Sequence, residues 1–110
     1  MTSTAGRVDI ALALADATRR DIIARVMRGE QSVSALARQY PMSFAAVQKH
    51  VAVLERAALV TKERRGREQV VHGDVTGLRK AARLLDAYEQ LWRDRVRGIE
   101  QILAEDSERQ

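Results

Sequence analysis

The stretch SVSALARQYPMSFAAVQKHVAVLERAALV, residues 32–60, decides the fold of this chain. Ser32 and Ser43 each stand before a run with helical spacing, and serine is a favoured residue at the start of a helix. Tyr40-Pro41-Met42 separates the two runs, because the residue before a proline avoids helical backbone angles. The pattern therefore predicts a short helix, a turn and a longer helix within residues 32–57, which is a helix-turn-helix.

The longer helix of this pair has two different faces. When its residues are placed 100° apart, Val47, Val51 and Leu54 fall on one side, which we expect to face the core. Gln48 and Lys49 turn outward beside small residues, an arrangement that suits a helix lying in the major groove of DNA. The residues expected to contact DNA here are Ser43, Ala45, Ala46, Gln48 and Lys49. The alternative is that Gln48 and Lys49 are ordinary solvent-facing residues.

One histidine and two arginines near these helices are more ambiguous. His50 falls on the flank of the core side, so we expect a half-buried, hydrogen-bonded histidine rather than one that reads a base. Asp16 is the expected cap of an earlier helix, whose first turn contains Arg19 and Arg20. Cations at the start of a helix oppose the helix dipole. Arg20 is therefore expected to pair with Asp16 or Asp21, while Arg19 is left open between pairing and a contact with the DNA backbone.

A β-hairpin is predicted directly after the helix-turn-helix. Two short β-prone runs flank Arg65-Gly66-Arg67, so residues 59–72 are expected to form a hairpin with Gly66 in its tight turn. A hairpin in this position is a wing, and its basic residues are expected to follow DNA phosphates or to enter the adjacent minor groove. These basic residues are Lys62, Arg64, Arg65 and Arg67. The alternative is that they form a solvated, basic hairpin without a partner.

The last helix is predicted to join two copies of the chain. Asp74 is its expected cap, and the apolar residues of the helix, residues 75–104, cover about half of its circumference. A helix that covers one side of its own domain needs a narrower stripe, so we expect this helix and a short first helix, residues 8–15, to form a dimer seam. The expected dimer contacts are Val8, Leu12, Leu85, Tyr88, Trp92, Val96, Ile99 and Leu103. The alternative is a last helix packed deeper into its own core.

Length and composition indicate one mainly α-helical domain with a small β-hairpin, spanning residues 1–110. Residues 19–83 carry 14 Lys and Arg against 6 Asp and Glu, which is typical of a nucleic-acid surface, although a solvated basic face is the alternative. The absence of cysteine excludes disulfides and thiolate metal sites. Neither a signal peptide nor a membrane-spanning run is evident, so we expect a cytoplasmic protein. No enzyme is expected, because the chain has no nucleophile arrangement and no glycine-rich phosphate loop.

The motifs, taken in order, resemble those of the ArsR/SmtB family of bacterial winged-helix repressors. The segments that carry the resemblance are ALADATRRDIIARV (13–26), SVSALARQYPMSFAAVQKHVAVLERAALV (32–60) and KERRGREQVV (62–71). The resemblance covers about residues 10–103 and implies a homodimer joined through the first and last helices. It also implies binding to an inverted-repeat operator in double-stranded DNA, at its own or a neighbouring promoter. In such repressors an inducer commonly relieves repression, and the sequence does not identify one.

The sequence departs from the metal-sensing members of that family. Those members carry a Cys-x-Cys pair where this chain has Ser32-Val33-Ser34, and hydroxyls are poor ligands for soft metals. At the family's second metal site Asp86 matches one ligand, but Tyr88, Ile99 and Ile102 replace the others. The chain therefore resembles the members that sense no metal, and neither a metal nor a cofactor is expected.

Two other functions stay open at this point. One is a metal-responsive regulator with a non-standard site that uses His50, His72 and acidic residues. The other is a winged-helix module that binds protein partners through its long last helix, its basic surface being incidental. A steep dependence of DNA affinity on salt would favour the DNA-binding reading over this module.

Overall fold

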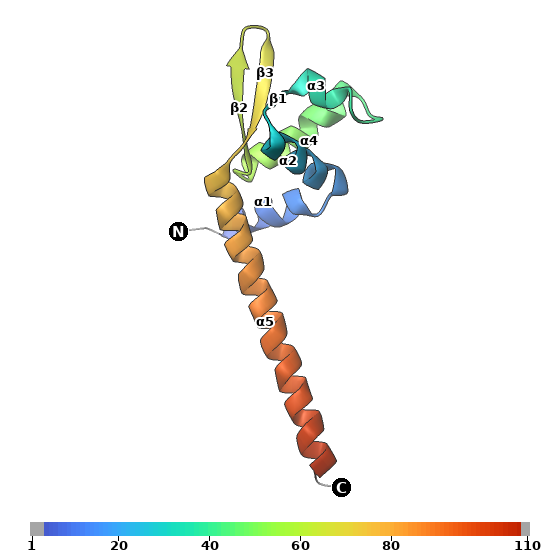
Figure 1. Ribbon diagram of the computed structural model, residues 1–110, viewed down its shortest axis with the longest axis vertical. Helices are drawn as coiled ribbons and strands as arrows, with labels where there is room; N and C mark the ends of the chain where they lie inside the picture. The colour runs from blue at the N-terminus through green and yellow to red at the C-terminus, as the bar shows by residue number, and fades with distance from the viewer. Residues whose placement is uncertain (1–3, 109–110) are drawn as a thin grey trace.

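The chain folds as helices packed around a small sheet, with one helix projecting from the rest. The structure, a computed structural model, describes residues 4–108. Its elements are α1 (Thr4–Leu14), α2 (Ala17–Arg28), β1 (Gln31–Ser32), α3 (Val33–Ala37), α4 (Phe44–Arg56), β2 (Val60–Arg65), β3 (Glu68–Gly73) and α5 (Val75–Glu108). The β2–β3 hairpin stands at one end of the molecule, and α5 runs toward the opposite end (Figure 1). Within residues 4–108, no helix combines the length and the hydropathy needed to cross a lipid bilayer.

The expected order of helices and hairpin is confirmed, and the outer helices are longer than predicted. α1 includes Thr4 rather than beginning at residue 8, since residues 4–7 contain no proline that would stop a helix. α5 continues to Glu108, past the expected end at residue 104, because no glycine or proline follows Gly98. Both extensions lengthen the helices that the sequence assigns to a dimer seam.

The sheet has a third strand that the sequence pattern did not predict. Gln31 and Ser32 form β1, which pairs antiparallel with β3 opposite Val71 and Val70 and gives the order β1-β3-β2. Two residues are too few for an alternating pattern to be recognised. At the far end of the hairpin, Gly66 has a φ of 62°, the left-handed conformation that a two-residue turn needs. The strand β1 therefore attaches the wing to the segment that connects α2 with α3.

The core lies between α2, α3, α4 and the sheet. Val47, Val51 and Leu54 are fully buried, as the 100° spacing along α4 predicts. The other fully buried large side chains are Ile22, Leu36, Leu59, Val60 and Val71. Since the buried side of α4 is continuous, its opposite side is free to face solvent or a partner.

Three of the four expected helix caps are observed at the starts of α2, α3 and α4. The carboxylate of Asp16 and the hydroxyls of Ser32 and Ser43 each accept a hydrogen bond of 3.0–3.1 Å from the backbone N–H three residues further on. The bond from the Arg19 N–H holds the pKa of the Asp16 carboxyl below its usual range. These caps fix where α2, α3 and α4 begin, and each is worth about 1 kcal/mol.

The turn between α3 and α4 is held against α2 by Tyr40. Its hydroxyl donates a 2.6 Å hydrogen bond to Asp21 Oδ2, and the Arg25 guanidinium lies 5.2 Å from the centre of its ring. Partial burial, together with the carboxylate of Asp21, raises the pKa of the Tyr40 hydroxyl to about 12. Tyr40, the residue before Pro41 at which the helix is interrupted, thus also holds this turn against α2.

The end of α4 is closed by Ala58 in a conformation that usually belongs to glycine. Ala58 has a φ of 58°, its N–H donates to Glu55 O at 2.9 Å, and the N–H of Leu59 donates to Leu54 O at 3.0 Å. This pair of bonds is a Schellman motif, and both of its leucines, Leu54 and Leu59, are fully buried in the core. A left-handed alanine costs roughly 1–2 kcal/mol, which the motif offsets.

The start of α5 presses against this turn. Gly77 is buried, and a Cβ added there would lie 1.6 Å from the carbonyl oxygen of Ala58. Asp74 aligns the two segments, because its carboxylate accepts from Gly77 N at 3.0 Å while its own N–H donates to Leu59 O at 3.0 Å. Only glycine fits at position 77, so the departure of α5 is fixed by the end of α4.

Substitutions at this contact should change stability in opposite directions. Ala58→Gly removes the cost of the left-handed conformation and should raise the free energy of unfolding by about 1 kcal/mol. Gly77→Ala forces backbone atoms apart and should lower it by about 1–3 kcal/mol. Urea-induced unfolding followed by circular dichroism measures both changes. The matched control is Gly98→Ala, which lies on the same helix. Its added methyl group meets no atom within 4 Å, so this substitution should raise the free energy of unfolding slightly. A Gly77→Ala protein as stable as the Gly98→Ala protein would contradict this account.

Candidate nucleic-acid interface

The outward face of α4 has the composition and exposure that the sequence predicts. Ala45, Gln48 and Lys49 are exposed, and Ala46 is half-buried. Within the described range, the side chains of Gln48 and Lys49 make no hydrogen bond or ion pair. Ser43 uses its hydroxyl oxygen to accept from Ala46 N, which leaves its proton free for another acceptor. This face of α4 thus presents two side chains with unpartnered hydrogen-bond donors, Gln48 and Lys49, beside small residues. The opposite face of the helix is apolar and fully buried.

The four basic residues of the wing do not form one group. Side chains alternate between the two faces of a strand, so Lys62 and Arg64 share one face of β2 and Arg65 lies on the other. The Lys62 Nζ lies 3.6 Å from Glu55 Oε1 on α4, which places the first face on the side of that helix. Arg67 is exposed in the turn, and neither it nor Arg64 has an ion-pair partner among residues 4–108.

Arg65 belongs to a four-residue cluster that the sequence did not predict, which we call the wing clasp: Glu30, Glu63, Arg65 and His72. Arg65 contacts the carboxylates of Glu30 and Glu63, the latter at 3.1 Å. His72 lies between the same carboxylates, with Nδ1 3.0 Å from Glu30 Oε2 and Nε2 3.1 Å from Glu63 Oε2. Hydrogen bonds from Arg65 lower the pKa of both glutamates and raise that of the guanidinium. The clasp ties the wing to the connection between α2 and β1.

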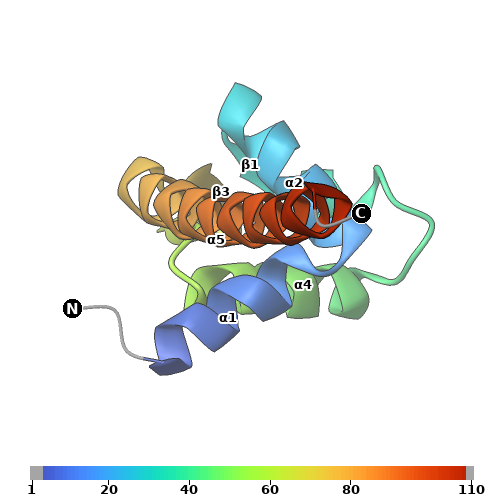
Figure 2. The same ribbon diagram turned by 90° about the horizontal axis from the view of Figure 1, so that it is seen from below.

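Arg19, which the sequence left open, joins three helices. Its Nε donates to Ala13 O at 3.0 Å and its Nη2 to Leu12 O at 2.6 Å, so it closes the carbonyl end of α1. Its Nη1 lies 3.3 Å from Nδ1 of His50 on α4. His50 is thus half-buried and hydrogen-bonded, as predicted. α1 lies beside α4 in the view from below (Figure 2). The side chain of Arg19 is therefore committed inside the protein.

The expected pairing of Arg20 with an aspartate is wrong. The Arg20 Nη1 donates to Leu14 O at 2.7 Å, while Asp16 caps α2 and Asp21 accepts from Arg25 and Tyr40. The carbonyl groups at the end of a helix lack partners, and both arginines at the start of α2 supply donors to them.

Comparison with known proteins places the chain in a family. The model of a helix-turn-helix domain family matches residues 14–63. The HTH-type transcriptional regulator Rv2034 of Mycobacterium tuberculosis is 40% identical over 91 residues, which are 83% of this chain and 82% of that protein. The solved structure of an ArsR-like transcriptional regulator from Rhodococcus sp. RHA1 is similar, with a TM-score of 0.70 and 35% identity, and the match covers 89% of this chain and 92% of that chain. The chain belongs to the ArsR family.

Like its family, this ArsR-family protein is a DNA-binding transcriptional regulator. A homodimeric winged helix-turn-helix DNA-binding domain from Mycobacterium bovis, solved by NMR, is 26% identical with a TM-score of 0.62, covering 81% of this chain and 79% of its own. The fold of this chain has the parts of that architecture: a helix-turn-helix in α3 and α4, a wing in β2 and β3, and a long last helix.

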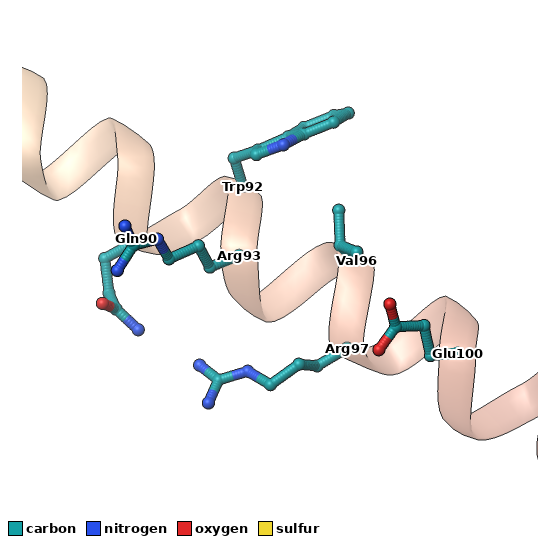
Figure 3. Close-up of a pocket in the computed structure, with 6 residues that line it drawn as sticks. All are labelled: Gln90, Trp92, Arg93, Val96, Arg97 and Glu100. Atoms are coloured by element: carbon teal, nitrogen blue, oxygen red, sulfur yellow. The ribbon is translucent and has the colours of Figure 1, made fainter.

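The ArsR-family chain carries an apolar strip along α1 and α5. All the expected dimer residues except Val96 are at least half exposed, and Val96 is half-buried. Trp92 and Val96 extend to one side of α5, whereas Gln90 and Arg97 extend to the other (Figure 3). Leu91 and Ile102, which are not among the expected dimer contacts, belong to the same wide apolar face and are each 66% exposed. The alternative of a last helix packed deeper in its own core is wrong, because the buried residues of α5 are Gly77 and Ala81 at its start.

Both histidines of this chain contact other side chains of the fold. Within residues 4–108, no group of three or more histidine, aspartate or glutamate side chains is placed to hold a metal ion. His50 lies on α4 against Arg19, and His72 lies on β3 in the wing clasp. The Ser32 hydroxyl, at the position of the family's Cys-x-Cys pair, caps α3.

Removing the Arg19 side chain should loosen the junction of α1, α2 and α4. Arg19→Ala leaves two carbonyl groups and His50 without their donor, and should lower the free energy of unfolding by about 1–3 kcal/mol in urea titrations. Arg19→Lys should recover little of this, since one ammonium group cannot reproduce the planar fork. Arg20→Ala, which removes one exposed bond from the same turn, is the control and should cost no more than about 0.5 kcal/mol. Full stability of Arg19→Lys would show that charge alone matters at this position.

Proposed function

We propose that the chain is a homodimeric repressor that binds an inverted-repeat operator at its own or a neighbouring promoter, in the cytoplasm. The observation that carries this proposal is the outward face of α4. There the exposed side chains of Gln48 and Lys49 lie beside Ala45, while the opposite side of the helix is buried in the core. In this proposal residues 32–57 are the helix-turn-helix, 59–72 the wing and 75–104 the dimerisation helix of a single domain, residues 1–110. Its signal is not a metal.

Base reading is assigned to the first turns of α4. Gln48 can form two hydrogen bonds with the major-groove edge of adenine, and Lys49 can reach guanine or a phosphate. Ala45 and Ala46 allow the helix to approach closely and can contact thymine methyl groups. Ser43 has a free hydroxyl proton beside the helix start, where backbone N–H groups also favour a phosphate.

Phosphate contacts of the wing are assigned to Arg64 and Arg67. Both are exposed and without an ion-pair partner in the described part of the chain. Lys62 faces the same side but is paired with Glu55, so its contribution requires an exchange of partners. Arg65 is the weakest of the four contacts predicted from the sequence, because the wing clasp already occupies its guanidinium.

The exposed apolar strip on α1 and α5 supports the homodimer. A strip of this length on a soluble regulator marks a protein interface, and a second copy is the partner that the homodimeric relative from Mycobacterium bovis exemplifies. A two-fold axis would place two α4 helices about 34 Å apart, or one turn of DNA, and so match an inverted repeat. The competing function, a module that binds other proteins through α5, leaves the free donors of α4 without a role.

Replacing Gln48 should reduce sequence discrimination. The operator is first isolated by selecting bound fragments from the genomic DNA of the source organism. Gln48→Ala should then lower the preference for operator over random DNA by about 1–3 kcal/mol, because adenine loses its bidentate partner. Fluorescence anisotropy with both DNAs measures this difference. Gln90→Ala on the polar side of α5 is the control. Unchanged discrimination in Gln48→Ala would remove Gln48 from the reading residues.

The two faces of the wing should differ in the salt dependence of binding. Each lost phosphate contact reduces the slope of log affinity against log salt by about 0.9. Arg64→Ala and Arg67→Ala should each reduce the slope by this amount, whereas Arg65→Ala should leave it unchanged. The slope is measured by anisotropy titrations between low and physiological salt. An equal loss in Arg65→Ala would mean that the clasp opens on DNA, and a flat response of the unaltered protein would favour the protein-binding module.

A further inference from the structure

A cleft between α1 and α5, which we call the basic cleft, combines an apolar floor with a basic rim. It has a volume of about 280 Å³ and is lined by Arg7, Ile10, Lys80, Arg83 and Leu84. Ile10 is buried and Leu84 half-buried, while the three basic residues are exposed. All five residues belong to one chain, so a site formed by them requires no second copy.

The three cations of the basic cleft have no counter-charge within the described part of the chain. Arg7, Lys80 and Arg83 make no hydrogen bond or ion pair among residues 4–108, and no carboxylate is among the described residues that line the cleft. Like charges that line one cleft repel one another, and an anion placed between them offsets this repulsion. Guanidinium groups also bind carboxylate and phosphate oxygens through two parallel hydrogen bonds. The rim is therefore suited to an anionic group.

A second hollow, further along α5, shows the opposite pattern of charge. It has a volume of about 420 Å³ and lies beside Arg93 and Arg97 (Figure 3). The Arg93 Nη2 lies 2.5 Å from Glu89 Oε1, and Arg97 pairs with Asp94. Because carboxylates of the chain already neutralise these cations, the hollow has little attraction for an anion. Of the two hollows, the basic cleft is the one that offers unpaired charge over a buried apolar residue.

The volume of the basic cleft limits its occupant to a small molecule. One turn of an α-helix about 10 Å across fills roughly 400 Å³, which exceeds the volume of the cleft. Ligand pockets in proteins have volumes of about 300–1,000 Å³, and the basic cleft lies just below this range. A short apolar chain or a single ring is therefore the group expected on the floor of the cleft.

We propose that the basic cleft binds a small acidic amphiphile, a molecule with one carboxylate or phosphate group on a short apolar body. The apolar body lies on the floor of the cleft, where its burial removes apolar surface from water. Arg7 on α1 and Lys80 and Arg83 on α5 bind the anionic group from two sides, so one molecule joins the two helices. Arg19 also joins α1 to α4. An occupant of the cleft is therefore connected, through α1, to the helix to which base reading is assigned.

Titration calorimetry of the unaltered protein with octanoate and octyl phosphate tests the chemistry of this site. Both probes carry the same apolar chain, so the tighter of the two identifies the anionic group. 1-Octanol and octylammonium keep the chain without the negative charge, and acetate keeps the charge without the chain. Each of these three should bind roughly tenfold more weakly than octanoate, or less tightly still, because the cleft requires both parts of the molecule. Equal binding of 1-octanol would show an apolar contact alone, and equal binding of acetate would show an adventitious ion only. Either result, or no binding of both octyl anions, would overturn the proposal.

Neutral substitutions locate the bound probe. Lys80→Gln with Arg83→Gln removes two charges from the rim and should raise the dissociation constant for octanoate about tenfold, and Arg7→Gln should raise it by a smaller factor. Arg93→Gln with Arg97→Gln makes the same change of net charge at paired cations of the same helix and should leave the constant unchanged. An equal loss in the two double variants would mean attraction by net charge alone, and an unaffected Arg7→Gln would place the probe on α5 without α1. Each of these results would overturn the cleft as the site. Circular dichroism checks that every variant retains its helices.

Discussion

The contact between the carbonyl oxygen of Ala58 and the backbone of Gly77 sets the geometry on which the other functional parts depend. It joins the last turn of α4 to the first turn of α5 at a distance that excludes a Cβ. The helix α4, to which base reading is assigned, and the helix α5, which carries the apolar strip, therefore have a fixed relative direction. In a two-fold dimer this direction determines the separation of the two α4 helices. In the proposed homodimer, a strained alanine and an obligatory glycine, neither of them on the proposed base-reading face, would thus help to set the spacing of the operator.

Basic residues in this protein divide into those that the fold uses and those that it leaves free. Arg19, Arg20 and Arg65 are held by carbonyl oxygens or carboxylates of the chain itself. Lys49, Arg64 and Arg67 have no such partners among residues 4–108 and lie on α4 or the wing. Free cations are available to phosphates without the loss of an existing bond, so the division indicates which charges act outward. Net charge alone would not separate the two groups.

Local rules of sequence predict much of this structure, and contacts across the fold account for the rest. The buried side of α4, which consists of Val47, Val51 and Leu54, follows from 100° steps, and the caps of α2, α3 and α4 follow from residue type. The strand β1 and the wing clasp depend on which residues lie opposite one another in the sheet, and a two-residue strand leaves no pattern in the sequence. The sequence predicts an ion pair between Arg20 and a neighbouring aspartate, but Arg20 instead donates a hydrogen bond to a carbonyl group at the end of α1.

The short strand β1 has a consequence for how such a regulator can be switched. Its backbone hydrogen bonds join the connection before α3 to the wing strand β3, and the clasp adds side-chain contacts at the same place. The helix-turn-helix and the wing are therefore joined by backbone and side-chain contacts, and a signal that bent the wing alone would have to break them. In the proposed homodimer, the less costly motion is a change in the distance or tilt between the two copies, so a signal that acts on the α5 seam would release DNA without altering either proposed DNA-binding surface.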